Sequence, residues 1–343
     1  MKNIFIIGAM ALFVSCKQEQ PPKDYAVIHG TIENPKEGLN LRLYNPETSK
    51  STAIKVDENG QFRDTLKLEL PVTFTSVYGE IFNLYLKNDM DVEINFDADK
   101  ISESIVYKGN GKAENDFLKS KSKQVLNLLG KDYKIYLGLN QADFEAKTNA
   151  FVNKIYSQLE EQQAVLGADF VDAEKKKIDA FKKNMTSQHL EQLKINEELA
   201  QGKPSPDFKD YLNYDGGTTS LKDLQGSYVY IDVWATWCVP CVYEIPYLKE
   251  VEKEFHGKNI KFVSISVDRK ADEKKWRDMI MEKELGGVQL LADNEISSKF
   301  MTDYYIYGIP RFILLDPNGN IVSYDAPRPS MPELKDLISS LDI

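Results

Sequence analysis

Two cysteines three positions apart, Cys238 and Cys241, lie between an apolar stretch and a helical one. Tyr228–Val233 is predicted to be a buried strand, and Cys241–Phe255 has the pattern of a helix. Ile260–Val267 is a second strand, too apolar to have a solvent face, and this strand, helix, strand order predicts a buried parallel sheet. We therefore expect the cysteine pair at the start of a helix in an α/β domain.

Further elements of the same domain follow the second strand. They are a helix at Ala271–Lys283, a short strand at Val288–Leu291, a hairpin of Arg311–Leu315 with Asn320–Tyr324, and a closing helix at Pro332–Leu341. The residues Gly202-Lys203-Pro204-Ser205-Pro206 break helical structure ahead of the domain. The α/β domain is therefore placed at residues 202–343.

A helix start gives the two cysteines different roles. Its unpaired backbone N–H groups and partial positive charge favour a thiolate. Cys238 is then the exposed attacking nucleophile, and Cys241, one helical turn on, resolves the mixed disulfide. Pro240 suits the first helical turn because its missing N–H would have had no partner there.

Two other readings of the pair are weaker. Zinc would need two more ligands, and the remaining candidates, Cys16, His29, His189 and His256, have no ligand spacing, so no metal is expected. A purely structural disulfide is geometrically possible, but so small a loop constrains the unfolded chain little. A disulfide framework would need more cysteines.

Several motifs in order support a family resemblance. Trp237–Pro246 reads Trp-Cys-Val-Pro-Cys-Val-Tyr-Glu-Ile-Pro, and it follows Val233-Trp234-Ala235-Thr236. Tyr307-Gly308-Ile309-Pro310 comes later in the chain. From about residue 206 to 343 the chain resembles the TlpA/ResA-like periplasmic thioredoxins of the thioredoxin superfamily, with an extra β domain ahead of it as in some bacterial lipoproteins.

The resemblance implies a thioredoxin fold with a cis Ile309–Pro310 bond. Pro310 would pack against the cysteine pair. The residues implied to bind an extended substrate are Trp237, Val239, Pro240, Ile309 and Pro310. Arg311 stands where the family usually has Thr, so this cation is expected to modulate which substrates dock.

Two acidic residues are further candidates. Asp232 lies where thioredoxin has a buried acid, and burial would raise its pKa so that it accepts the Cys241 proton. The alternative is a solvated Asp at a strand edge, and thioredoxin's partner Lys has no counterpart in Phe262–Val267. Glu244 matches the family's Glu, as a modulator of the pair or equally as a surface acid favoured by the helix dipole.

The N-terminus has the pattern of an export signal. Met1 and Lys2 precede the apolar run Ile4–Val14, which is too short to span a bilayer. Leu12-Phe13-Val14-Ser15-Cys16 resembles a lipobox, which implies a signal peptide at 1–15 and lipid attachment at Cys16. An ordinary signal cut after Ala9-Met10-Ala11 is the alternative.

Three parts are predicted between the signal and the α/β domain. Residues 16–24 form a polar tether, and regular turn formers between short β-branched stretches predict an antiparallel β domain at 25–111. Helical periodicity predicts amphipathic helices at 112–201. Their apolar faces are expected to pack against neighbouring domains, with a docking surface for a partner as the alternative.

The net charge of −10 argues against a nucleic-acid partner, and no cofactor is expected. The resemblance implies a thiol:disulfide oxidoreductase that reduces protein disulfides in the cell envelope, as in cytochrome c maturation. Its electrons would come from a membrane donor, and it would face the periplasm from a lipid anchor in the inner or outer membrane.

The first alternative function is net oxidation or isomerisation of disulfides, which is the same chemistry at a higher potential. A lipid-anchored partner-binding protein with a thioredoxin scaffold is the other alternative. A peroxiredoxin-like thiol peroxidase ranks low, because Ile231 and Ala235 stand where that pattern needs Pro and Thr.

Overall fold

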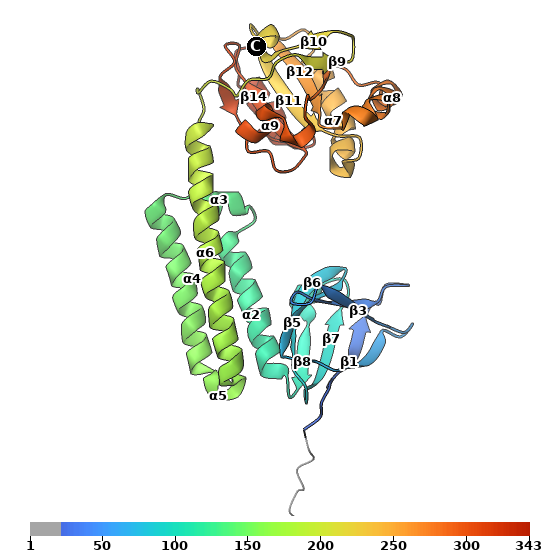
Figure 1. Cartoon of the computed structure of the whole chain (residues 1–343), viewed down its shortest axis with the longest axis vertical. Coiled ribbons are helices and arrows are strands. Elements are labelled where there is room, and N and C mark those ends of the chain that lie inside the picture. Colours follow the sequence, from blue (N-terminus) through green and yellow to red (C-terminus); the bar gives the residue numbers. More distant parts are fainter. Residues whose placement is uncertain (1–21) are drawn as a thin grey trace, which may run out of the picture. The chain divides into compact units, whose positions relative to one another are not determined.

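The computed structural model describes residues 22–343 (Figure 1). The chain consists of two compact units, Met1–Met185 and Thr186–Ile343. The predicted signal peptide, Cys16 and most of the predicted tether lie outside the described residues. The boundary between the units falls within a long helix, Ala168–Glu198, whereas the predicted composition break at Gly202 follows the end of that helix. Between residues 22 and 343, no helix combines the length and the apolar character that crossing a bilayer requires.

The first unit contains β strands followed by helices. The strands are β1 (Ala26–Glu33), β2 (Leu41–Asn45), β3 (Lys50–Ile54), β4 (Gln61–Leu66), β5 (Val72–Tyr78), β6 (Glu80–Leu86), β7 (Asp91–Asp97) and β8 (Val106–Gly109). The helices are α1 (Ile101–Ser104), α2 (Lys112–Leu129), α3 (Tyr133–Leu137), α4 (Gln141–Glu161), α5 (Gln163–Leu166) and α6 (Ala168–Glu198). The β-rich region and the helices after it agree with the expected fold class.

The strands form two four-stranded sheets, in the orders β4-β1-β7-β8 and β3-β2-β5-β6. Pairing is antiparallel except between β1 and β7, which run parallel. A parallel pair needs a long crossover connection, and β2 to β6 lie between these two strands in the chain. In β5 buried residues alternate with partly exposed ones, and Phe74 shares an apolar core with Phe117 of α2 and Ile155 of α4. The sheets and helices of this unit therefore share one core.

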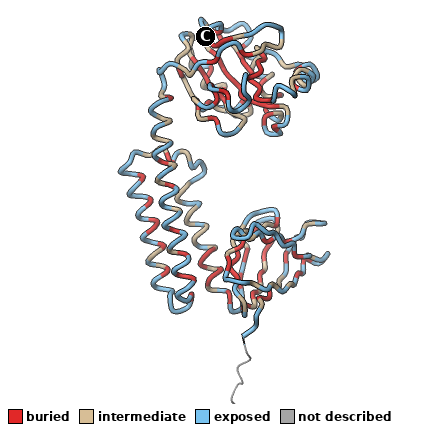
Figure 2. The backbone as a smooth tube through the Cα atoms, viewed as in Figure 1, coloured by how far each residue is buried: buried red, intermediate tan, exposed pale blue. Residues whose placement is uncertain are grey.

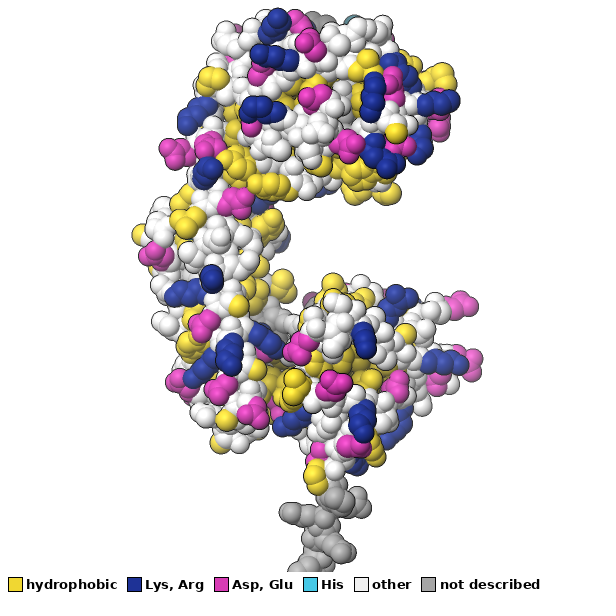
Figure 3. Space-filling view, in the orientation of Figure 1, with side chains coloured by type: hydrophobic (Ala, Val, Ile, Leu, Met, Phe, Trp, Pro, Cys, Tyr) yellow, Lys and Arg dark blue, Asp and Glu magenta, His cyan; other side chains and the backbone are white. Residues whose placement is uncertain are grey.

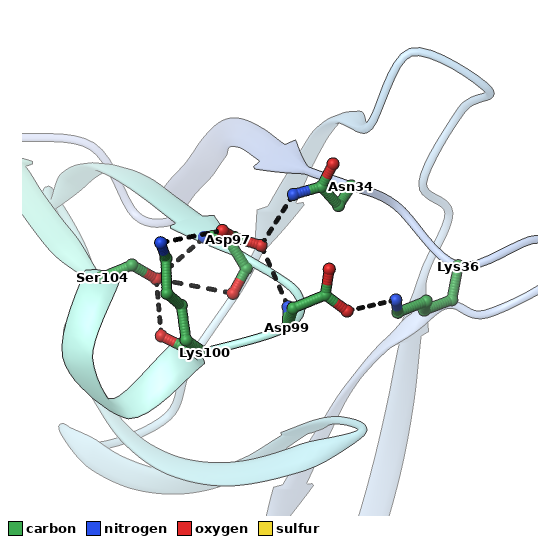
Figure 4. A network of polar contacts seen from close by, with 6 residues as sticks. All are labelled: Asn34, Lys36, Asp97, Asp99, Lys100 and Ser104. Carbon is green, nitrogen blue, oxygen red and sulfur yellow. Dashed lines mark hydrogen bonds and ion pairs between the residues drawn. The ribbon is translucent and has the colours of Figure 1, made fainter.

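A network of hydrogen bonds and ion pairs joins the segment after β1 to the end of β7 and to α1 (Figure 4). The Asp97 carboxylate accepts hydrogen bonds from the Asn34 side chain and the Asp99 backbone N–H, both at 3.0 Å. Its own N–H donates to the Ser104 hydroxyl at 2.9 Å, and the Lys100 ammonium lies 3.5 Å from the carboxylate. The Asn34 hydrogen bond, followed by the Asp99 one, lowers the pKa of Asp97. The network ties the end of β1 to the turn after β7 and is structural.

The second unit is an α/β domain. Its strands are β9 (Tyr211–Asn213), β10 (Thr218–Thr219), β11 (Tyr228–Trp234), β12 (Ile260–Ser266), β13 (Val288–Leu291), β14 (Arg311–Leu315) and β15 (Ile321–Ser323). Its helices after α6 are η1 (Leu221–Leu224), α7 (Val239–Glu254), η2 (Lys270–Asp272), α8 (Glu273–Lys283), η3 (Glu295–Ser297), α9 (Lys299–Asp303) and α10 (Pro332–Ser339). The predicted order of strands and helices is confirmed.

These strands make one seven-stranded sheet in the order β10-β9-β13-β12-β11-β14-β15. β11, β12 and β13 are parallel neighbours, and β14 runs antiparallel to β11. One apolar cluster joins Tyr230 of β11 to Val251 of α7 and Leu334 of α10. Another joins Ile231 of β11 to Trp276 of α8, and since alternate strand residues face opposite sides, the sheet is covered on both faces (Figure 2). This is the thioredoxin-like arrangement expected from the sequence.

Over the face that Figure 3 draws, Lys and Arg side chains are interspersed with Asp and Glu. No extended basic patch is visible on that face.

Candidate active site

Strand β11 leads into the site from inside the sheet. All of its residues except Tyr228 are buried, and it is hydrogen-bonded to β12 on one side and β14 on the other. Because both edges of the strand are paired, its end at Trp234 is a fixed point from which the following loop is positioned.

That loop is held by Asp268, a residue that the sequence analysis did not single out. Its carboxylate accepts hydrogen bonds from the Thr236 N–H at 2.9 Å and from the Thr236 hydroxyl at 2.8 Å. The Ser266 hydroxyl also donates to it, at 2.7 Å, and Asp268 is only 1% exposed. Asp268 therefore anchors the turn that precedes Cys238.

Cys238 and Cys241 form a disulfide, with their Cα atoms 5.2 Å apart. Cys238 is the N-cap of α7, and its Sγ accepts a hydrogen bond from the Cys241 N–H at 3.2 Å. Pro240 lies in the first turn, as predicted. An N–H at a helix start that already points at sulfur would stabilise negative charge there once the disulfide is reduced.

The expectation that Cys238 is exposed is wrong for this oxidised form. Cys238 is 5% exposed and Cys241 is 3% exposed. The Cys238 sulfur is folded back on the helix start, where it is bonded to Cys241 and faces that residue's N–H. The exposed neighbours are Trp237 at 66% and Val239 at 79%, so these side chains form the accessible rim of the site.

Asp232 is buried on β11, with 8% of its surface exposed, so the solvated alternative is excluded. Burial is the main cause that raises the pKa of Asp232 to about 8, and the negative charges of Glu244 and Glu252 add to it. Ser264 is its neighbour on β12, which agrees with the absence of a partner Lys noted in the sequence. Asp232 is therefore protonated in most molecules at neutral pH and can exchange a proton near that pH.

Glu244 is also buried, at 4% exposed, so it is no surface acid. Its two carboxylate oxygens accept hydrogen bonds from the Ser330 N–H and the Ser330 hydroxyl, both at 2.9 Å. Ser330 lies just before α10, so two segments far apart in sequence fix this carboxylate in the interior, where its charge acts on Asp232.

Glu252, which also lies on α7, is a further acid near the site that sequence reasoning missed. Burial raises its pKa to about 7, partly offset by the Lys249 charge. It lines a cavity of about 550 Å³ together with Gly286, Gly287 and Phe262. Glu252 is half-buried, and the sequence around it is rich in Lys and Glu and resembles a solvated helix face, so no pattern indicated its raised pKa.

The Ile309–Pro310 bond is cis, as the resemblance implies. Ile309 packs against the same apolar cluster that contains the two cysteines. Arg311 follows at the start of β14, and its guanidinium forms an ion pair with Asp325 at 3.2 Å. The Arg311 side chain is only 18% exposed, so its charge is already engaged within the fold.

Among residues 22–343, no group of His, Cys, Asp and Glu is arranged to hold a metal ion. The predicted lipid-attachment site, Cys16, lies outside the described residues.

Comparisons with known proteins match this part of the chain. The Redoxin family model matches residues 200–338. The thiol-disulfide oxidoreductase ResA of Bacillus thuringiensis is 26% identical over 128 residues, which are 37% of this chain and 69% of that protein. ResA of Bacillus subtilis is 27% identical over 126 residues, 37% of this chain and 67% of that protein.

Solved structures are also similar. The thioredoxin domain of a thiol-disulfide oxidoreductase from Bacteroides vulgatus is 30% identical with a TM-score of 0.37, covering 41% of this chain and 96% of that one. A thiol-disulfide oxidoreductase from Bacteroides fragilis is 29% identical with a TM-score of 0.35, covering 39% of this chain and 99% of that one.

A mixed sheet with parallel β11, β12 and β13, a cysteine pair at a helix start and a cis proline, together with the matched family model, define a thioredoxin-like domain. The protein is an enzyme of the thiol-disulfide oxidoreductase kind, similar to ResA in its C-terminal domain.

Proposed function

We propose that this enzyme reduces protein disulfides in the cell envelope, facing the periplasm from a lipid anchor at Cys16. Reduction of the disulfides met in cytochrome c maturation is the route that the family resemblance given in the sequence analysis implies. The observation that carries the proposal is the redox pair Cys238 and Cys241 at the start of α7, with a buried acid on the adjoining strand.

The first step begins with the reduced enzyme. The Cys238 thiolate, favoured by the helix start, attacks one sulfur of a substrate disulfide. A bond forms between Cys238 and that sulfur, and the second substrate sulfur leaves as a thiolate and takes up a proton. The substrate is now held through a mixed disulfide, with Trp237 and Val239 exposed beside it.

In the second step Cys241 resolves this intermediate. In the molecules in which the Asp232 carboxyl is ionised, the Cys241 thiol loses its proton to that carboxylate, and the Cys241 sulfur attacks the Cys238 sulfur. The mixed disulfide breaks, the substrate leaves with two thiols, and the enzyme holds the Cys238–Cys241 disulfide. An acid with a pKa of about 8 supports this role because it both accepts and releases a proton close to neutral pH.

The enzyme disulfide must then receive two electrons and two protons before another cycle. We assign that step to a dithiol donor in the membrane, which attacks the enzyme disulfide by the same exchange chemistry. An anchor at Cys16 would keep the enzyme close to such a donor, since covalent lipid binds a protein to the membrane surface.

Trapping of the mixed disulfide tests the proposal. In Cys241→Ala the resolving thiol is missing, so substrate should stay bound to Cys238 and appear on a nonreducing gel as complexes that dithiothreitol removes. The matched control is the double variant Cys238→Ala, Cys241→Ala, which should capture nothing. Equal capture by both variants, or none by either, would contradict an exchange enzyme, and capture of none would favour the partner-binding alternative.

A further inference from the structure

The last turns of α6, Thr186–Glu198, belong to the second compact unit although the Redoxin family match begins at residue 200. Ile195 packs against the apolar cluster that contains the cysteine pair, and Leu199, just past the helix, is buried in it. This end of α6 therefore packs as part of the unit that holds the cysteine pair.

The first set of contacts lies on the N-terminal side of the cis proline. The Tyr307 hydroxyl donates a hydrogen bond to the Glu191 carboxylate at 3.1 Å. Tyr307 is 76% exposed, so this bond to α6 restrains a ring that is largely surrounded by solvent. The Tyr305 hydroxyl donates a hydrogen bond to the Glu198 carboxylate. Tyr305 has a φ of +53°, a backbone conformation that residues other than Gly rarely adopt.

The second set of contacts lies on the C-terminal side of the proline. The Tyr324 hydroxyl accepts a hydrogen bond from the Gln192 amide at 3.0 Å and donates one to the Asn196 carbonyl oxygen at 2.8 Å. Asp325, the next residue, pairs with Arg311, which directly follows Pro310. One helix thus contacts the chain on both sides of the cis-proline loop, Tyr307–Arg311.

We propose that the end of α6 positions the cis-proline loop and thereby sets how tightly the enzyme binds an extended disulfide-containing protein segment. The inference rests on the proposed function and on the expectation, implied by the family resemblance, that such a segment docks at Ile309 and Pro310. The positioning residues are Glu191, Gln192 and Asn196, acting through Tyr307 and Tyr324. They act on binding and leave the chemistry of the cysteine pair unchanged.

The physical reason is preorganisation. A loop that is already held in its bound conformation loses less conformational entropy when a substrate docks on it. A small disulfide that reacts at Cys238 without docking on the loop gains nothing from this restraint. The two kinds of substrate should therefore respond differently when contacts to α6 are removed.

The test follows single turnovers with disulfide in excess, in which the reduced full-length protein itself supplies the two electrons, so KM is the half-saturating concentration and kcat the limiting rate. The variants are Tyr324→Phe and Tyr307→Phe, which keep the ring and remove the hydroxyl. Two probes are used, a synthetic peptide closed by a disulfide and dithiobis-nitrobenzoate as the small disulfide. For each variant we expect KM for the peptide to rise about three- to tenfold, the size expected for loss of one or two hydrogen bonds, with kcat within about twofold. The rate with dithiobis-nitrobenzoate and the midpoint potential of the cysteine pair should not change.

Tyr211→Phe is the matched control, since it removes a hydroxyl that bonds to Ser298, away from α6. It should leave KM for the peptide unchanged. Combining Tyr324→Phe with Asn196→Ala should raise KM by less than the product of the two single effects, because both remove the same contact.

An unchanged KM in both tyrosine variants, or an equal change for both disulfides, would overturn the positioning role while leaving the proposed function intact. If the unmodified enzyme reduces neither disulfide, the proposed function itself fails.

Discussion

Replacing Asp232 with Asn should change how the stability of the second unit depends on pH. In the unfolded chain this carboxyl has a pKa of 3.8, and in the folded protein burial, aided by the charges of Glu244 and Glu252, raises the pKa to about 8. Asn has nearly the same size and stays neutral at every pH. The variant therefore removes the titration of this group while keeping the volume of the buried side chain.

The sign follows from counting protons. Between about pH 4 and pH 8 the folded protein keeps a proton on Asp232 that the unfolded chain has released, so the free energy of unfolding falls as pH rises. At about 1.4 kcal/mol for each pH unit, Asp232 alone should remove about 2 to 3 kcal/mol between pH 5 and pH 7. The loss should level off above about pH 8. Relative to the unmodified protein, Asp232→Asn should gain that amount over the same interval.

Urea unfolding followed by tryptophan fluorescence measures this directly. The sequence has three Trp residues, Trp234, Trp237 and Trp276, and all belong to the second unit, so the signal reports that unit alone. Unfolding free energies of the oxidised protein would be compared at several pH values between about 5 and 8. The exposed Asp342→Asn is the control, and its stability difference from the unmodified protein should stay constant.

Parallel stability curves for the unmodified protein and Asp232→Asn would refute the reasoning. That result would mean that the fold does not raise the pKa of Asp232, and an Asp232 carboxylate of ordinary pKa is too weak a base for the proposed role as proton acceptor for Cys241.

Other variants test separate parts of the site. Glu252→Gln should remove a smaller part of the same pH dependence, about 1 kcal/mol of unfolding free energy between pH 5 and 7. The effect is smaller because the pKa of Glu252, about 7, is lower than that of Asp232 and because Glu252 is partly solvated. The same urea series measures this change. Asp268→Ala removes the acceptor for the Thr236 N–H and hydroxyl, so it should lower the free energy of unfolding by about 2 to 4 kcal/mol. A loss below about 1 kcal/mol would show that other contacts hold the loop before Cys238. Trp237→Ala should alter stability by less than about 0.5 kcal/mol because its side chain is 66% exposed, yet raise KM for a peptide disulfide, and an unchanged KM would exclude a substrate contact.

The sequence predicted the second unit well because its strands are buried on both faces. β11 and β12 are near-continuous apolar runs, and both were located to within a residue or so. Strand β3 carries little sequence signal because it is a polar edge strand in which only Ile54 is buried. Strands β9 and β10 were missed because two or three residues show no periodicity.

The site was predictable where it depends on local sequence. The position of the cysteine pair at a helix start and the fit of Pro240 follow from local sequence, and the cis bond before Pro310 was implied by the family resemblance. The contact of Glu244 with Ser330 and the anchoring of Thr236 by Asp268 join residues far apart in the chain, so no spacing indicates them. The exposure of Cys238 was predicted wrongly because it depends on how the sulfur packs in the disulfide.

The midpoint potential of the Cys238–Cys241 pair tests the central claim most directly. The purified protein would be equilibrated in defined thiol/disulfide buffers, with the fraction of reduced enzyme read from tryptophan fluorescence and checked by alkylation of the two thiols. The account predicts a two-electron midpoint near or below about −250 mV, in the range of thioredoxin. A midpoint between about −180 and −120 mV would contradict a reductase and assign the protein to disulfide oxidation or isomerisation.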